Sequence, residues 1–75
     1  MTDNLLKKIG IKLKFERMKK GFSQEELAEA AKISSNLVSL IERGKSNPTV
    51  ETIAALSKAL DISIEELINP KNIEL

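Results

Sequence analysis

The sequence of 75 residues lacks cysteine, histidine, tryptophan and tyrosine, and it has only two phenylalanines and two prolines. Without cysteine there is no disulfide framework, and without cysteine or histidine the usual zinc ligands are missing. The same absences remove the commonest general base and the strongest nucleophile, which argues against an enzyme. We therefore expect a protein with no metal and no other cofactor.

Long hydrophobic runs are also missing. No segment approaches the ~20 apolar residues of a membrane span, and the first ten residues, MTDNLLKKIG, lack the apolar stretch of a signal peptide. We expect a cytoplasmic protein without membrane contact. Hydrophobic residues still make up 41% of the chain, enough for a globular core built from aliphatic side chains. At this length the chain should form a single domain over residues 1–75.

The charge is unevenly spread, although the net charge is only +1. Residues 1–20 carry seven basic and two acidic side chains, whereas residues 46–75 are net acidic. A lysine-rich end attracts anions such as nucleic acid, but the same composition suits a helix that only faces solvent. Charge alone leaves both interpretations open.

Helix start and stop signals predict an all-α fold of five short helices and no strand. The first helix is expected over residues 3–20, with Asp3 as its cap and Gly21 as its stop. Capping boxes, each a serine followed three residues later by a glutamate, open the second and fifth helices. Ser23–Glu26 opens a second helix over about 24–31, and Ser34 opens a third that ends at Gly44. Thr49 caps a fourth helix, which bears Leu60, and Ser63–Glu66 opens a fifth that runs through Ile68.

The second and third helices are the informative pair. Each is about eight residues long, and a turn of three or four residues joins them, so they should cross steeply as in a helix-turn-helix. Small Ala28 and Ala31 would let the two axes approach closely, while Val38 and Ile41 should point into the core. An all-helical protein-interaction module can show the same pattern, so this geometry alone does not require DNA.

The chain resembles the phage repressor and Cro-type (Cro/C1-type) helix-turn-helix family over a run that reads FSQEELAEAAKISSNLVSLIERGKSNPTVETIAALSKALDISIEELI. The similarity rests on the Ser-Gln-Glu-Glu-Leu-Ala opening, the Ile-Glu-Arg-Gly-Lys exit from the third helix and the Pro-Thr-x-Glu-Thr-Ile start of the fourth. It covers residues 13–68, with the motif at about 24–43 and a short tail at 69–75. The resemblance implies a compact five-helix fold of the lambda repressor type. It also implies a homodimer that places its third helix, about 34–42, in the major groove of a roughly palindromic duplex DNA operator.

The resemblance also implies roles for single residues around the third helix. Its first turn and the same face one turn later lie where the family reaches base edges, and a leucine there can meet a thymine methyl. The residues expected at base edges are Ser35, Asn36, Ser39, Leu40 and Arg43. The residues expected at the phosphate backbone are Gln24, Ser34, Lys45, Ser46 and Asn47. The simpler alternative is a set of exposed polar residues, with cations that only complement the helix dipole.

Arg17 matches the arginine that in the family bridges to the glutamate at the end of the recognition helix, here Glu42. The chain departs from the family at two positions. Lys32 stands in the turn where glycine is common, so a left-handed backbone there would cost roughly 1 kcal/mol. Glu16 stands just before the arginine, where an apolar residue is common.

The first helix carries two apolar strips, of which one should face the core. Leu6, Ile9 and Leu13 form the Leu13 strip. Ile11, Phe15 and Met18 form the Phe15 strip. The strip that does not face the core is either covered by the tail or part of a contact surface. A homodimer interface is expected in the C-terminal third, which is net acidic and has surplus aliphatic side chains. The residues expected there are Leu60, Ile64, Ile68, Ile73 and Leu75.

The sequence therefore predicts a sequence-specific transcriptional regulator, such as a restriction-modification controller, a small phage repressor or a regulator of its own operon. The competing class is a protein-interaction module, for example an antitoxin or anti-regulator, whose main ligand is another protein. In that case the Phe15 strip or the C-terminal aliphatic residues would bind the partner. The operator sequence, and the choice between activation and repression, do not follow from the residues.

Overall fold

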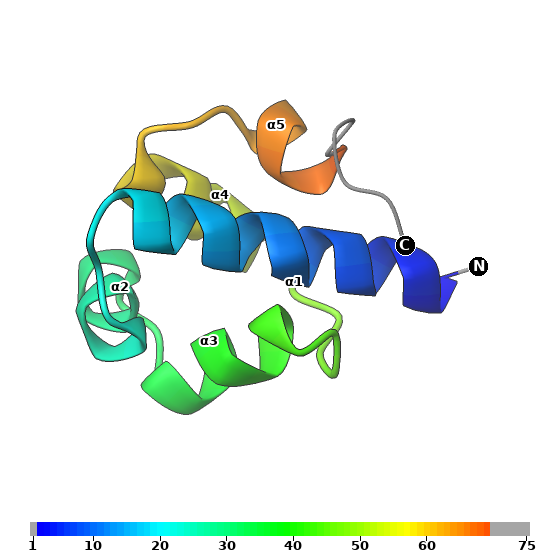
Figure 1. Cartoon of the computed structure of the whole chain (residues 1–75), viewed down its shortest axis with the longest axis horizontal. Coiled ribbons are helices and arrows are strands. Elements are labelled where there is room, and N and C mark those ends of the chain that lie inside the picture. The colour runs from blue at the N-terminus through cyan, green and yellow to red at the C-terminus, as the bar shows by residue number, and fades with distance from the viewer. Residues whose placement is uncertain (1, 70–75) are drawn as a thin grey trace.

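In the computed structural model, which describes the backbone of residues 2–69 and the side chains of residues 4–69, the chain forms five helices and no strand within those bounds. The helices are α1 (Thr2–Lys19), α2 (Gln24–Ala31), α3 (Ser35–Glu42), α4 (Val50–Leu60) and α5 (Ile64–Ile68) (Figure 1). The prediction of an all-α fold is confirmed. None of the helices in this described part is both long and apolar enough to cross a membrane.

Helix starts follow the predicted caps with two exceptions. Ser23 forms the full capping box: the Glu26 amide donates to its hydroxyl over 3.0 Å, and its own amide donates to the Glu26 carboxylate over 2.9 Å. The Ser63 hydroxyl accepts a hydrogen bond from the Glu66 backbone amide. The Glu66 carboxylate accepts from this same hydroxyl and not from the Ser63 backbone amide, so the second capping box is incomplete. Helix α1 begins at Thr2, which places Asp3 inside the helix, and its predicted role as cap is wrong.

The turn between α2 and α3 depends on a left-handed residue. Lys32 has φ 60° and ψ 42°, the left-handed backbone considered for this position, and its amide donates to the carbonyl of Glu29 over 3.2 Å. The next amide, of Ile33, donates to the carbonyl of Ala28 over 2.9 Å. These two bonds close the end of α2 and redirect the chain within a few residues. In Figure 1, α2 is seen almost end-on while α3 runs across the view, which is the steep crossing expected of the pair.

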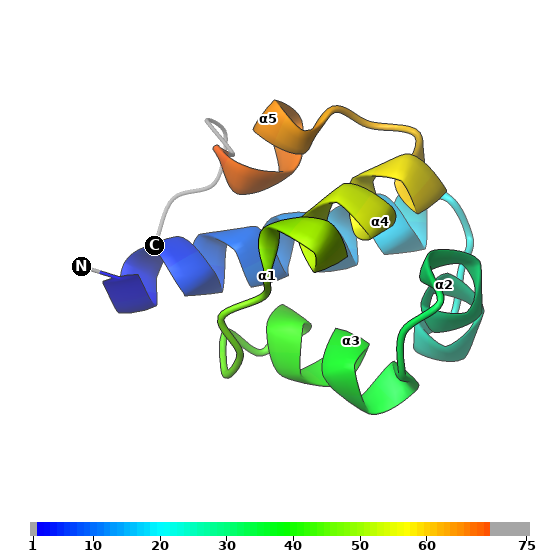
Figure 2. The ribbon, with the colours of Figure 1, turned by 180° about the vertical axis from the view of Figure 1, so that it is seen from behind.

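Helix α1 organises the molecule. It packs against α3 on one side and α5 on the other, whereas α2 packs against α3 and α4 (Figure 1). Helix α4 lies behind α1 in Figure 1 and in front of it in Figure 2, so the core lies between these two helices and the α2–α3 pair. Within residues 2–69, one face of α1 has no helix packed over it.

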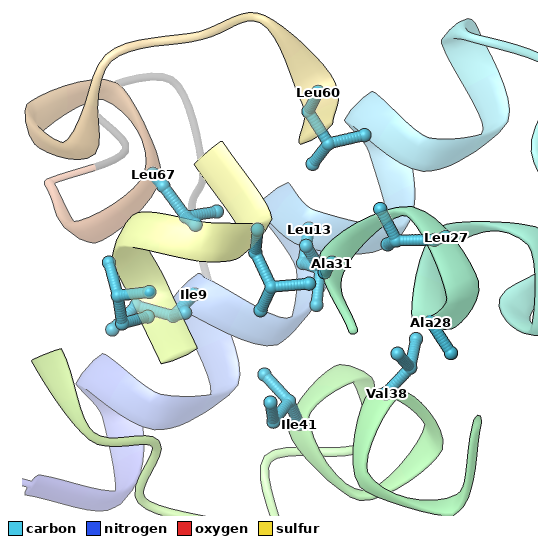
Figure 3. Packing of buried hydrophobic residues seen from close by; sticks show 11 residues of the cluster. Ile9, Leu13, Leu27, Ala28, Ala31, Val38, Ile41, Leu60 and Leu67 are labelled. Carbon is cyan, nitrogen blue, oxygen red and sulfur yellow. The ribbon is translucent and has the colours of Figure 1, made fainter. Parts of the chain in front are cut away.

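The buried part of the core consists of aliphatic side chains (Figure 3), in keeping with the shortage of aromatic residues, and the half-buried Phe22 packs against it. Val38 and Ile41 of α3 are buried, which confirms their predicted place. On α1 the Leu13 strip faces the core, whereas Ile11, Phe15 and Met18 of the Phe15 strip are 40%, 56% and 61% exposed. The buried residues are Ile9, Leu13, Leu27, Ala28, Ala31, Val38, Ile41, Ile53, Leu56, Leu60 and Leu67.

Leu60 belongs to this core and not to an outer surface. It has no exposed area, so its predicted place in a dimer interface is not available to it. The reason is its spacing: Leu60 follows Leu56 by four residues and Ile53 by seven, which puts all three on the face of α4 that is buried. Of the other residues predicted for the interface, Ile64 and Ile68 are 42% and 41% exposed, and Ile73 and Leu75 lie outside the described residues.

Glu16, the second departure from the family pattern, is also buried. Only 4% of the residue is exposed, and its carboxylate accepts a hydrogen bond from the Lys12 ammonium over 2.8 Å. The lysine lies one turn earlier on α1, and 19% of its side chain is exposed. The position that is apolar in the family is therefore occupied here by a paired charge.

Candidate nucleic-acid interface

The first turn of α3 exposes polar side chains because the residue before it provides the cap. The Ser34 hydroxyl accepts a hydrogen bond from the Leu37 amide over 3.0 Å, which confirms its capping role. Ser35 and Asn36, the first two residues of the helix, are exposed, and Ser39 one turn later is half-buried. Their side chains point to the same outer side of α3 because residues three and four apart share a helix face.

This side of α3 joins the start of α2 in an open depression of about 510 Å³, called here the α2–α3 depression. Both helices begin there, and free backbone amides at helix N-termini favour anionic groups. Three of the five residues expected at base edges thus lie beside Gln24, one of those expected at the phosphate backbone. The lining residues are Arg17, Ser23, Gln24, Glu25, Ser35, Asn36 and Ser39.

A buried ion pair fixes the helices around the depression. Arg17 on α1 donates from Nε to Glu42 Oε2 over 2.6 Å and from Nη2 to Oε1 over 3.2 Å. Its third group, Nη1, donates to the carbonyl of Phe22 over 2.7 Å. The side chains of Arg17 and Glu42 are only 11% and 3% exposed. The two residues that the family resemblance pairs are therefore in two-point contact, which holds the end of α3 on α1.

Gln24 adds α2 to this network. Its side-chain amide donates to Glu42 Oε1 over 3.1 Å, so the carboxylate is held by helices α1 and α2 together. A primary amide has two N–H groups, and this bond uses one of them. The second N–H and the backbone amides at the start of α2 stay available for a phosphate oxygen.

The remaining predicted contacts lie at the other end of α3. Arg43 closes the helix, is exposed, and donates from Nε to the Ser39 carbonyl over 3.4 Å. On the connection to α4, Lys45 and Asn47 are exposed and Ser46 is half-buried, as is Leu40 within α3. None of these residues lines the depression. The predicted contacts therefore extend along the whole of α3, roughly 12 Å at 1.5 Å per residue, from its first turn at the depression to the connection that follows it.

Two residues of this region were not predicted as part of it. A Cβ atom at Gly10 would lie 2.5 Å and 2.6 Å from the carbonyl oxygens of Ile41 and Glu42, so α1 touches the backbone of α3 there. A glycine inside a helical pattern was the available signal. Glu25 places a carboxylate in the depression, where it can accept a hydrogen bond from a cytosine amino group and repels phosphate. Its position next to Gln24 was the only hint.

Comparison with known proteins agrees with this geometry. A family model described as helix-turn-helix matches residues 13–67 of the chain. The HTH-type transcriptional regulator SinR of Bacillus licheniformis is 38% identical over 65 residues, which are 85% of this chain and 59% of that protein. The chain thus spans about three fifths of the length of this relative.

Two solved structures share the arrangement of the helices. The restriction-modification controller protein C.AhdI from Aeromonas hydrophila matches with a TM-score of 0.81 and 40% identity, covering 83% of this chain and 94% of that one. SinR, the master regulator for biofilm formation, in complex with DNA matches with a TM-score of 0.78 and 37% identity, covering 81% of this chain and 98% of that one.

Proposed function

Because the chain belongs to the Cro/C1-type helix-turn-helix family, we propose that it is a transcriptional regulator that binds specific sequences of duplex DNA. One observation carries this proposal: Ser35, Asn36 and Ser39 lie beside the start of α2 on a single face. The Arg17–Glu42 ion pair holds the helix that bears them. Support also comes from the likeness to SinR, a relative whose solved structure includes DNA.

In the proposed complex α3 enters the major groove and reads base edges with its outer side. Asn36 can bond an adenine with two hydrogen bonds, whereas Ser35 and Ser39 accept several partners. Leu40 would meet a thymine methyl, and Arg43 at the end of α3 would reach a further base. These side chains supply discrimination between sequences.

Contacts to phosphate fix the position of α3 on the duplex without reading sequence. Before α3 in the chain, Gln24 and free amides at the start of α2 would hold one phosphate. Ser34, the cap of α3, would also contact the backbone. At the other end, Lys45, Ser46 and Asn47 on the connection to α4 would hold a second phosphate. The lysine excess of α1 adds a diffuse attraction for DNA.

We further propose that the protein acts as a homodimer on a roughly palindromic operator. Helix α5 lies on the side of α1 opposite α3 and exposes Ile64 and Ile68, which supports an interface there (Figure 1). The predicted interface residues Ile73 and Leu75 belong to the same proposal. Two copies joined in this way could present their α3 helices ~34 Å apart, to successive major grooves.

Selection from a library of random DNA duplexes tests the proposal. We expect enrichment of a two-fold symmetric site whose half-sites are centred ~10 base pairs apart or a multiple of that spacing. Titration of the enriched duplex should give a Kd about 10³-fold or more below that of a scrambled duplex, with both values rising steeply with salt. Equal binding to the selected and scrambled duplexes would contradict sequence-specific regulation.

A second function, protein binding, is favoured by one specific observation. All three residues of the Phe15 strip are exposed, so no helix in the described part of the chain covers this strip of α1. This face differs from the α2–α3 depression, so protein binding and DNA binding do not exclude each other.

A further inference from the structure

We propose that the Phe15 strip is a docking site for an acidic amphipathic helix of a second protein. Ile11, Phe15 and Met18 follow one another at spacings of four and three residues, which align them along one face of α1. They are 40%, 56% and 61% exposed. A single exposed apolar residue is ordinary on a protein surface, but a continuous strip over two helical turns marks a contact surface.

Lysines border the strip on both sides. At 100° per residue, the spacing along α1 places Lys7 and Lys14 on one edge and Lys8, Lys12 and Lys19 on the other. The ammonium groups of Lys12 and Lys19 lie 5.7 Å and 5.9 Å from the centre of the Phe15 ring. Positive charge therefore stands directly beside the apolar surface.

Among the described side chains of α1, a single carboxylate offsets only one of these lysines, Lys12. The one acidic residue of α1 after Asp3 is Glu16, which is 4% exposed and paired with Lys12. A ligand for this face must bring apolar side chains for the strip and negative charge for both of its edges. An amphipathic helix with leucines along one side and glutamates beside them has that chemistry.

Two other occupants fit less well. A second copy of this chain would bring lysines against lysines, because both edges of the strip are basic. A flat membrane with anionic lipids would meet α5 as well as α1, and the exposed Glu65 and Glu66 of α5 repel such lipids. A single acidic helix, about 10 Å wide, can lie on α1 alone. The charge pattern therefore favours a protein helix.

The position of the strip allows DNA and the partner to bind together. Helix α3 meets α1 at Gly10 and Arg17, which lie about a quarter of a turn or more away from the Phe15 strip around the helix axis. In Figure 1, α1 runs in front with α3 on one side and α5 on the other, and no helix crosses its front. A partner there would join the protein to other machinery without displacing the duplex.

The test uses a synthetic helical peptide of about four turns, with leucines at the spacing of the strip, glutamates on both sides of them and a fluorescent label. Two control peptides carry serines in place of the leucines, or lysines in place of the glutamates. Fluorescence anisotropy measures binding to the intact protein, with and without duplex DNA. We expect the first peptide to bind with a Kd below about 1 mM and both controls to bind roughly tenfold more weakly or not at all.

Matched variants locate the site. The double variant Phe15→Ser/Met18→Ser should weaken peptide binding by roughly tenfold and leave the Kd for a DNA duplex within about twofold. The control Val50→Ser removes another exposed apolar side chain, 79% exposed at the start of α4, and should change neither. Because the substituted residues are exposed, we expect all variants to fold, and circular dichroism checks this.

Several outcomes would overturn the proposal. The proposal fails if the glutamate peptide does not bind to the protein at all. It also fails if the peptide binds to Phe15→Ser/Met18→Ser as tightly as to the parent protein. Binding of phosphatidylglycerol vesicles that needs Phe15, without peptide binding, would assign the strip to a membrane. Self-association that Phe15→Ser abolishes would assign it to a second copy. Nuclear Overhauser effects from Ile73 or Leu75 to the Phe15 ring in the free protein would assign it to the tail. A failure of the DNA selection alone would affect only the proposed regulator function.

Discussion

Arg17 connects three parts of the fold through one side chain. It reaches Glu42 with two donors and the carbonyl of Phe22 with a third. Glu42 is almost fully buried, so its charge depends on these donors and on Gln24. A charge left without its partner in such a site is far costlier than an exposed one. The ion pair therefore matters for the orientation of α3 as well as for stability.

The first prediction concerns this pair. Arg17→Ala should lower the free energy of unfolding by about 3 kcal/mol, since Glu42 would keep only the bond from Gln24. A double-mutant cycle with Glu42→Ala, measured by urea denaturation, should give a coupling of about 2 kcal/mol. Lys20→Ala, at an exposed position just after α1, is the control and should change little. A coupling below about 0.5 kcal/mol would mean that the pair is not a brace.

At the scale of the helices, the backbones of α1 and the end of α3 touch directly. Gly10 lets the two backbones meet, and Arg17 holds them together from the same side of α1. Any change in this contact tilts α3 relative to α2. The exposed residues of α3 would then move relative to the phosphate contacts at its two ends.

The second prediction is Gly10→Ala. Helix propensity alone would make this change stabilising by about 1 kcal/mol, because α1 is helical there. The added methyl group would instead meet two backbone oxygens, and we expect a net loss of about 1–2 kcal/mol in urea denaturation. Discrimination between operator and scrambled DNA should fall as well. A Gly10→Ala protein that is more stable than the parent would show that α1 and α3 are free to separate.

The third prediction uses the cap of α3. Aspartate caps a helix about as well as serine, so Ser34→Asp should leave stability within about 0.5 kcal/mol. The added negative charge should weaken DNA binding by roughly tenfold or more if Ser34 faces phosphate. Ser63→Asp makes the same change at the cap of α5, on the side of α1 away from α3, and should leave DNA binding unaltered (Figure 1). Equal DNA affinity of Ser34→Asp and the parent would remove Ser34 from the interface.

Most of the helices could be predicted because their signals are local. Ser34 and Thr49 cap the helices that follow them, and the left-handed Lys32 follows from its place in the turn. Features that depend on packing between distant segments were missed. The contact at Gly10 needs the position of α3, which no local pattern contains. The spacing of Leu60 from Ile53 and Leu56 puts the three on one face of α4, but it does not say whether that face meets the core or a partner.

The same limit applies to the candidate site. The resemblance supplied Arg17 and Glu42 as a pair, and they are in contact. The bond from Gln24 to Glu42 was not predicted, because a glutamine at a helix start gives no sign of which neighbour it meets. Nor could the sequence decide which strip of α1 faces the core, since both strips have helical spacing.

At the scale of the whole molecule, two groups of exposed apolar side chains among the described residues are proposed as contact surfaces. Ile64 and Ile68 on α5 are proposed for the dimer interface, and the Phe15 strip is proposed to bind a second protein.

The fourth prediction separates the two surfaces by sedimentation. The parent protein should form a dimer at micromolar concentration, and Ile64→Ser/Ile68→Ser should be monomeric and bind two half-sites without cooperativity. Phe15→Ser/Met18→Ser serves as the control and should remain dimeric. Only monomer at high concentration, with and without selected DNA, would contradict the proposed interface.

The central claim is that α3 reads bases while the residues flanking it hold phosphate. The most direct test is a titration of Asn36→Ala and Lys45→Ala on a selected operator and on a scrambled duplex at two salt concentrations. Asn36→Ala should cost about 1–3 kcal/mol on the operator and little on the scrambled duplex, so the specificity ratio falls. Lys45→Ala should weaken binding to both duplexes about equally and lower the salt slope by about one. If Asn36→Ala weakens binding to both duplexes equally, Asn36 is a backbone anchor, and the claim that the first turn of α3 reads sequence is contradicted.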